Sequence, residues 1–207
     1  MVRLAIGERF LMIAEKLRRV KPSSIWFADY FERTTIGSEW NTSGVASASI
    51  VSGQLVTEGN TYAFYTNVGV KYTGSLGLTG DFEITVDYDY VARAVDLARM
   101  IVALFDSSDN ALAFGGMHDA KSTQSPGFHC GIYDGASYFS GYNTRDASGN
   151  CVVVFKRVGS TLYVYEGATQ RVSDTMETAV DYIVLVNERK DANPGKTVKW
   201  NYVIVRG

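Results

Sequence analysis

The stretch Gly80-Asp-Phe-Glu-Ile-Thr-Val-Asp-Tyr-Asp-Tyr90 decides the fold class, because apolar and polar side chains alternate along its length. Successive side chains of a β-strand point to opposite faces of the sheet. The apolar members share one face: Ile84, Val86, Tyr88 and Tyr90. The polar members share the other: Glu83, Thr85, Asp87 and Asp89. This pattern predicts an antiparallel strand with one face in the core and the other in water.

Runs of the same kind continue from residue 25 to the end of the chain, and no helical period interrupts them. Segments rich in Gly, Asn, Asp and Ser separate the runs, as at 51–54, 107–110 and 157–160. About fifteen strands are predicted, at 25–31, 45–51, 54–58, 61–66, 68–73, 81–91, 97–105, 110–116, 128–133, 136–142, 151–157, 160–166, 169–173, 180–188 and 197–206. Many short strands without crossover helices favour a two-sheet sandwich.

Residues 1–22 follow a different period. Apolar residues recur there at spacings of four, three, four and three, and form the stripe Ile6, Phe10, Ile13, Leu17 and Val20. This spacing predicts an amphipathic helix, which Pro22 ends because proline disfavours helical geometry in the preceding residue. The stripe packs either on the same chain or on a partner, and we favour a partner or further copies of the chain. We therefore divide the chain into a helix at 1–22 and a β-domain at 23–207.

The formal net charge of −2 hides an asymmetry between these two parts. Residues 1–21 contain six bases and two acids, a balance of +4, so the remainder carries −6. An acidic body is a poor duplex DNA binder, because phosphate contacts require clustered bases. No apolar run reaches the length of a membrane span, and charges break the apolar start where a signal peptide would be continuous. We expect a chain made in a cytoplasm, with no specific nucleic-acid binding and no membrane span.

Five segments follow the order and spacing of the concanavalin A-like superfamily, which includes the laminin G-like domains. They are Phe27-Ala-Asp-Tyr-Phe-Glu32 with Trp40-Asn41, Ile50-Val-Ser-Gly-Gln-Leu55, Gly80-Asp-Phe-Glu-Ile-Thr85, Phe155-Lys-Arg-Val-Gly-Ser-Thr-Leu-Tyr-Val-Tyr165 with Glu166-Gly167, and Trp200-Asn-Tyr-Val-Ile-Val205. The resemblance covers residues 26–206 and implies an all-β jelly roll of two antiparallel sheets, whose closing strand returns beside the first. It leaves the activity open, because the fold hosts lectins, glycanases, adhesion modules and virion proteins.

We expect no catalytic site. Retaining glycosidases require two closely placed carboxylates, and glycanases of the resembled fold carry them in an E-x-D-x-x-E run. Glu83, Asp87 and Asp89 share a strand face without matching that run, so we interpret them as the polar outer face of a sheet. The two histidines, His118 and His129, lie outside any nucleophile motif, and we interpret them as surface or hydrogen-bonded side chains. A glycoside hydrolase is the alternative.

The aromatic, glycine-rich stretch 132–143 is the candidate carbohydrate-binding patch. Sugar rings present C–H faces that stack on aromatic rings, and their hydroxyls pair with carboxylates, amides and guanidinium groups. The candidate residues are Tyr133, Asp134, Tyr138, Tyr142, Asn143 and Arg145. The alternative interpretation is that these tyrosines pack the sandwich, with their hydroxyls at its edge.

Cofactors other than calcium are not expected. Asp106, Asp109 and Asn110, with Asp146 to Asn150 further along, supply oxygens of the kind that calcium binds in loops. Short Asp/Asn turns are also ordinary punctuation of hairpins, so both interpretations stay open. Cys130 and Cys151 are interpreted as two buried thiols, with a single bridge as the alternative.

These observations together favour a non-catalytic structural or attachment module. We expect a bacteriophage virion surface protein, such as a capsid decoration, fibre or tail component, that displays a lectin-like jelly roll. Its expected partners are other virion proteins or its own copies through the helix, and cell-surface glycans through the body. The alternatives are a soluble carbohydrate-binding module and a glycan hydrolase or lyase.

Overall fold

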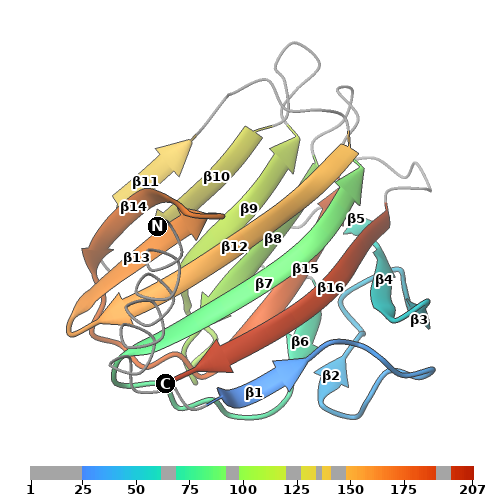
Figure 1. The fold of residues 1–207 in the computed structure, drawn as a ribbon, viewed down its shortest axis with the longest axis horizontal. Helices are drawn as coiled ribbons and strands as arrows, with labels where there is room; N and C mark the ends of the chain where they lie inside the picture. The colour runs from blue at the N-terminus through green and yellow to red at the C-terminus, as the bar shows by residue number, and fades with distance from the viewer. Residues whose placement is uncertain are drawn as a thin grey trace, which may run out of the picture.

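The computed structural model describes residues 25–61, 69–91, 98–119, 127–133, 137–140, 148–189 and 197–207. Every regular element in these ranges is a β-strand, and the strands form two stacked sheets (Figure 1). Within the same ranges, no helix is long and apolar enough to cross a membrane. The predicted helix at 1–22 lies outside the described residues. The all-β, two-sheet prediction is confirmed.

The first sheet, sheet A, faces the viewer in Figure 1. Its strands run in the order β14 (Thr169–Thr175), β13 (Thr161–Glu166), β12 (Ser148–Val158), β7 (Phe82–Val91), β16 (Thr197–Arg206), β4 (Gln54–Glu58) and β3 (Ser47–Val51). Strand β1 (Ile25–Asp29) also pairs with β16. The closing strand therefore returns beside the first, as the resemblance implies.

The second sheet, sheet B, lies behind sheet A in that view. Its order is β11 (Ser137–Ser140), β10 (Gly127–Ile132), β9 (Ala111–Asp119), β8 (Ala98–Phe105), β15 (Tyr182–Arg189), β6 (Val70–Tyr72) and β2 (Trp40–Asn41). The pairs along this order are antiparallel, whereas the short β5 (Asn60–Thr61) joins β15 in parallel. The four adjacent strands β10, β9, β8 and β15 of sheet B carry the site described below.

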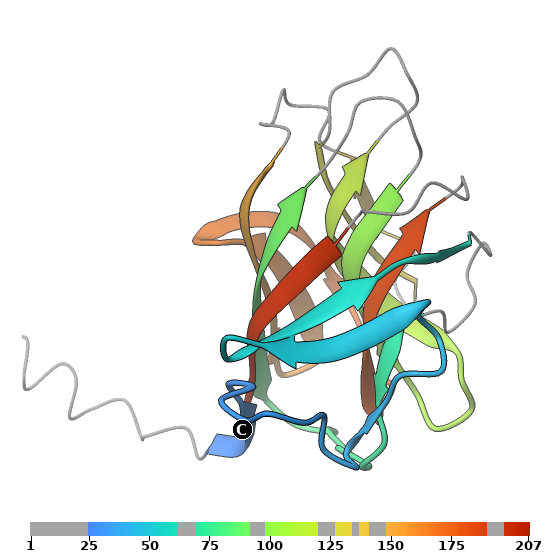
Figure 2. The same ribbon diagram turned by 90° about the vertical axis from the view of Figure 1, so that its right-hand side faces the viewer.

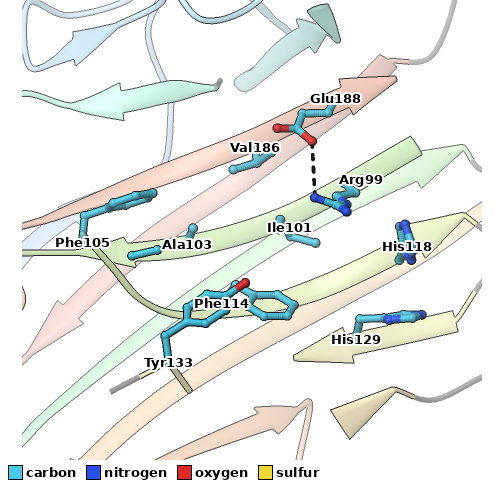
Figure 3. Close-up of a pocket in the computed structure, with 11 residues that line it drawn as sticks. Arg99, Ile101, Ala103, Phe105, Phe114, His118, His129, Tyr133, Val186 and Glu188 are labelled. Carbon is cyan, nitrogen blue, oxygen red and sulfur yellow. Dashed lines mark ion pairs between the residues drawn. The ribbon is translucent and has the colours of Figure 1, made fainter. Parts of the chain in front are cut away.

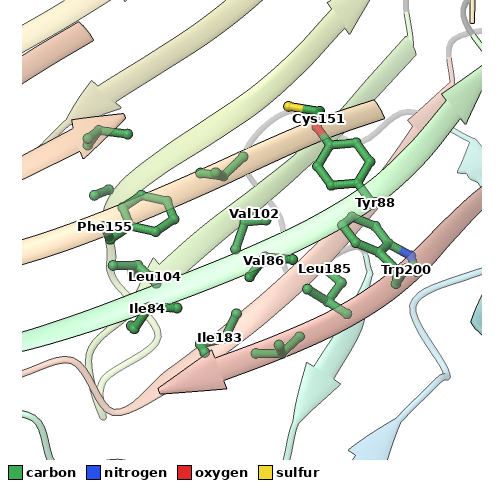
Figure 4. Close-up of a cluster of buried hydrophobic side chains, with 14 of the residues drawn as sticks. Ile84, Val86, Tyr88, Val102, Leu104, Cys151, Phe155, Ile183, Leu185 and Trp200 are labelled. Atoms are coloured by element: carbon green, nitrogen blue, oxygen red, sulfur yellow. The ribbon is translucent and has the colours of Figure 1, made fainter. Parts of the chain in front are cut away.

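Alternate residues of the central strands fill the space between the sheets. Ile84, Val86 and Tyr88 of β7 are fully buried, as the period-two pattern predicts. They lie among Val102, Leu104 and Leu185 from sheet B and Trp200 from β16 (Figure 4). Burial of such side chains contributes roughly 1.5–3 kcal/mol each relative to exposure. The core therefore sits where the two apolar faces meet, without help from a disulfide.

Tyr88 extends from this core into the backbone of sheet B. Its hydroxyl accepts a hydrogen bond from the Met117 N–H at 2.9 Å and donates one to the Met100 carbonyl. Met100 and Met117 are register partners, so the hydroxyl bridges the ladder between β8 and β9. Gly116 makes room for it, because a Cβ there would lie 2.7 Å from the hydroxyl oxygen and its φ is +148°. The burial of Tyr88 raises its pKa well above the ordinary value, so the phenol keeps its proton.

Polar links tie the two sheets together at both edges. Strands β3 and β4 cross one side of the sandwich (Figure 2), where the Asn187 amide of β15 donates to the Thr57 carbonyl at 3.0 Å. Within sheet A, the Trp200 indole of β16 donates to the Thr57 hydroxyl of β4 at 3.1 Å. At the other edge, Ser137 of β11 hydrogen-bonds to Asp174 of β14. The edges are thereby fixed as well as the centre.

One short strand, β2, was not predicted. The buried Asp29 carboxylate holds it in place, since it accepts from the Trp40 indole at 2.7 Å and the Phe31 N–H at 2.8 Å. Arg33 completes the network with an N–O distance of 2.6 Å to the same carboxylate. A two-residue strand gives no period-two signal, so its sequence could not reveal it.

Candidate functional site

A hollow of about 80 Å³ lies on the outer face of sheet B, away from the core. Strands β8, β9, β10 and β15 build it with the side chains that do not point between the sheets (Figure 3). Its floor is apolar and its residues come from neighbouring rows of the ladder: Ile101, Ala103, Phe105, Phe114 and Val186. Where the outer face of a sheet contacts water, the side chains that point outward are normally polar. The apolar outer face of sheet B is therefore unusual.

The floor is packed like a second core. Phe105, Phe114 and Val186 are each less than 10% exposed, although they lie on the outside of the sheet. The Phe105 ring stacks on Tyr182, with ring centroids 5.1 Å apart and planes 1° from parallel. Such stacked rings form a rigid, flat, apolar surface.

Four polar side chains gather at one end of the hollow. Glu188, Arg99 and His118 occupy one row of the ladder, because Glu188 pairs with Arg99 and Arg99 with His118. The Arg99 guanidinium lies 3.8 Å from the Glu188 carboxylate, which is 2% exposed. His129 lies one row away, with its ring 4.5 Å from that of His118 and nearly perpendicular to it. The hollow is therefore apolar along its floor and polar at one end.

Burial dominates the electrostatics of this cluster. It lowers the pKa of His118 to about 4 and that of His129 to about 4, and the nearby Arg99 charge acts in the same direction. Burial raises the pKa of Glu188 to about 7, against the opposing attraction of Arg99. At neutral pH both imidazoles are thus uncharged, and Glu188 is partly protonated.

Two atoms of the cluster have no hydrogen-bond partner within the described part of the chain. They are His118 Nε2 and Glu188 Oε2, and both are shielded from solvent. A buried polar atom without a partner costs about 1–3 kcal/mol, so native proteins rarely keep one without a function. His118 as a residue is half-buried, and its Nε2 atom is the part that departs from the interpretation as a surface or hydrogen-bonded side chain. The two atoms indicate a polar ligand group at this end.

Of the predicted patch, Tyr133 lies at the hollow. Its ring follows β10, is 41% exposed and stacks on Phe114, with centroids 5.5 Å apart. Tyr138 is in β11, paired with Gly131, and its side chain is not described. The other four candidates lie outside the described residues: Asp134, Tyr142, Asn143 and Arg145.

Three of the predicted calcium ligands, Asp106, Asp109 and Asn110, lie in the hairpin turn between β8 and β9, whereas residues 146 and 147 of the second predicted group lie outside the described residues. The Asp106 carboxylate accepts from the Ser108 N–H at 2.9 Å and from the Asn110 N–H at 2.8 Å. Asp109, whose φ is +63°, accepts from Tyr182 and from Lys71. No group of three metal-ligating side chains occurs among the residues that were placed. Both carboxylates therefore take part in hydrogen bonds of the fold, and a calcium ion at this turn stays a prediction.

The acidic residues of β7 lie on the other side of the sandwich from the hollow. Asp87 and Asp89 both accept from the Asn150 amide, at 2.8 and 3.1 Å, and Glu83 pairs with Arg206. They belong to the polar outer face of sheet A, as interpreted from the sequence. Cys130 and Cys151 are buried free thiols, which agrees with the first of the two predictions for them.

Arg99, Glu188 and Phe114 were not predicted as site residues from the sequence. A signal for them exists in two strands. In 100–105 and 182–186 the apolar residues do not alternate but run continuously; Arg99 precedes the first run, and Asn187 and Glu188 follow the second. A continuous apolar strand is buried on both faces. In a two-layer sandwich, this implies a covered or ligand-binding outer face with a charge at its rim.

No family model matches the chain, and no curated protein matches its sequence. Solved structures share its fold. The CBM2 module of the evolved Dit of Lactobacillus casei BL23 phage J-1 has a TM-score of 0.64 at 14% identity, over 88% of this chain and 95% of that one. A carbohydrate esterase of the Shiga toxin-encoding bacteriophage phi24B has a TM-score of 0.58 at 13% identity, over 88% and 98%.

A xylan β-1,4-xylosidase of Bacillus halodurans C-125 is also similar, with a TM-score of 0.60 at 13% identity. The match covers 87% of this chain but 39% of that enzyme, so the chain corresponds to about two fifths of it. At such identities the likeness establishes the fold. The predicted jelly roll of two antiparallel sheets is confirmed.

Proposed function

We propose that this chain is a carbohydrate-binding module of a bacteriophage particle, which holds a sugar ring in the hollow of sheet B. The observation that carries the proposal is the apolar outer face with unpartnered polar atoms at one end. Ligand sites in proteins combine an apolar lining with a few placed polar groups in this manner. The phage Dit module and the phage esterase, both similar in fold, support the phage assignment.

The dimensions of the hollow suit one ring. A volume of about 80 Å³ corresponds to roughly three water molecules at about 30 Å³ each, so the open hollow receives one face of a single ring and not a polymer. Tyr133 and Phe114 provide a stacked aromatic wall for the C–H face of that ring. The hydroxyls and other polar substituents would then point toward the polar end.

Binding without hydrolysis is the proposed mode. Glycosidases of the two-carboxylate type need a pair of carboxyl groups about 5–10 Å apart. Among the described residues that line the hollow, Glu188 supplies one carboxylate and the other polar groups are Arg99, His118, His129 and Tyr133. Asp87 and Asp89 lie on the opposite sheet and do not complete a pair.

Attachment to a particle is the second part of the proposal. The predicted helix at 1–22, with its balance of +4 on residues 1–21, would anchor the module to another virion protein or to sister chains. The hollow would then face outward as part of a capsid decoration, fibre or tail. What supports this role is the amphipathic stripe together with the likeness to phage proteins.

A glycan array with the full chain tests the binding role, followed by titration of the retained glycan against two variants. Tyr133→Ala removes the exposed aromatic wall. If the ring covers roughly 50 Å² of apolar surface, the loss is about 1.2 kcal/mol, or roughly eightfold in affinity. Tyr30→Ala is the matched control, because Tyr30 is 46% exposed and contacts Tyr202 of sheet A instead. Silence across the array, or equal losses in both variants, would refute the proposal.

A further inference from the structure

The polar end of the hollow is built to receive negative charge. The Arg99 side chain is 16% exposed, and its guanidinium donates hydrogen bonds but never accepts them. Its separation of 3.8 Å from the Glu188 carboxylate exceeds hydrogen-bond length. The cation faces an apolar floor, where a charge interacts more strongly than in water.

His118 adds a second contact on the same side. Its Nε2 is buried without a partner, and it donates a hydrogen bond whenever it carries the proton, in the neutral ring or in the imidazolium. Arg99 and His118 are register partners on adjacent strands, so both groups reach the same point of the hollow. A group with two acceptor oxygens and a negative charge matches this pair better than a hydroxyl does.

We propose, on the basis of the carbohydrate-binding role, that Arg99 and His118 form a carboxylate subsite and that the bound sugar is a uronic acid. The ring of the sugar lies on Phe114 and Tyr133. Its carboxylate pairs with the Arg99 guanidinium and accepts from His118 Nε2. Glu188, when protonated, donates from Oε2 to the same carboxylate.

The subsite makes binding depend on pH. The groups that face it are Arg99 of β8, His118 of β9, His129 of β10 and Glu188 of β15. Lys71 of β6 lies further off, because it pairs with Val184, four residues before Glu188 in β15, and its ammonium lies over the Tyr182 ring. A bound carboxylate raises the pKa of both imidazoles and of Glu188, so binding takes up protons. The affinity for an acidic sugar therefore rises as the pH falls from 8 to 6, whereas a neutral sugar shows no such rise.

The experiment is isothermal titration calorimetry of the full chain with three oligouronates: tri-galacturonate, tri-mannuronate and tri-guluronate. Each is compared with its carboxyl-reduced, neutral counterpart at pH 6 and pH 8. At least one acidic oligomer should bind about tenfold or more tightly than its counterpart, with a larger ratio at pH 6. Arg99→Gln should abolish the ratio, and Arg99→Lys should retain part of it because the charge stays.

Glu188→Gln keeps the test informative if Arg99→Gln fails to fold. It removes the competing carboxylate, so the acidic oligomer should bind more tightly at pH 8 and the pH dependence should shrink. Equal or tighter binding of the neutral counterparts overturns the carboxylate subsite and leaves the carbohydrate-binding role standing. Absence of binding to every oligouronate, while a neutral glycan is retained on the array, overturns the subsite in the same way. Absence of binding in both experiments overturns both proposals.

Discussion

Replacement of Tyr88 by Phe tests the claim that one hydroxyl bridges the ladder of sheet B. The change keeps the ring and removes the oxygen that accepts from Met117 N–H and donates to the Met100 carbonyl. Both backbone groups then lie buried without their partner, at a cost of about 1–3 kcal/mol each. Because Met100 and Met117 are register partners, they re-pair in part. The expected loss is about 2–4 kcal/mol of the free energy of unfolding.

Urea denaturation followed by tryptophan fluorescence measures this loss. The midpoint should fall while the slope m stays constant, because the surface exposed on unfolding is unchanged. Tyr30→Phe is the control, since that side chain is 46% exposed, and its effect should stay within about 0.5 kcal/mol. A loss for Tyr88→Phe below about 1 kcal/mol would show that the two backbone groups find other partners.

Three further predictions concern titration, thiols and assembly. The pKa of His118 and of His129 is about 4 against an ordinary 6.5, so between these values the unfolded chain binds more protons and the two histidines make the protein less stable as the pH falls. The pKa of Glu188 is about 7 against 4.5, so Glu188 makes the protein more stable as the pH falls through that range. Urea midpoints of a His118→Gln/His129→Gln variant should therefore rise from pH 7 to 5, and a fall would refute the assignment. Burial raises the pKa of Cys130 to about 12, so iodoacetamide at pH 8 should modify neither buried thiol until urea is added, as mass spectrometry reports. Deletion of residues 1–21 should reduce the mass by light scattering to that of one chain, and an unchanged oligomer would contradict the helix as anchor.

The architecture was accessible from the sequence because its strands obey a simple period. The stretch at 80–90 alternates without a break, and β7 buries its apolar face as expected. The residues of the turn also predicted where β3 ends and β4 begins. Ser52 and Gly53, between these two strands, both adopt positive φ. The pairing order was less accessible, because β7 pairs with β12 and β16, both distant along the chain. Period-two patterns specify faces but not neighbours.

The site was only partly accessible. Tyr133, which lines the hollow, was predicted as a binding residue because it lies in an aromatic, glycine-rich stretch, a composition that is common where ligands stack. Arg99 and Glu188 are separated by 89 positions and meet because β8 pairs with β15. No local pattern carries that information. Only the unbroken apolar runs of these two strands indicated that the outer face of sheet B is buried.

The Tyr88 bridge couples the core to the hollow. Met100 and Met117, which it joins, directly adjoin Arg99 and His118 in the chain. The spacing of β8 and β9 at the bridge thus sets the distance between the guanidinium and the imidazole.

Tyr88→Phe should consequently weaken the binding of an acidic oligomer several-fold even when the variant is fully folded. Leu162→Ala is the matched control, because Leu162 is fully buried in β13 of sheet A and its loss costs a comparable 2–5 kcal/mol or so. Calorimetry at 10 °C, with both variants shown to be folded, compares the two. If Leu162→Ala weakens binding as much as Tyr88→Phe, general loss of stability explains the effect, and the bridge does not position the site.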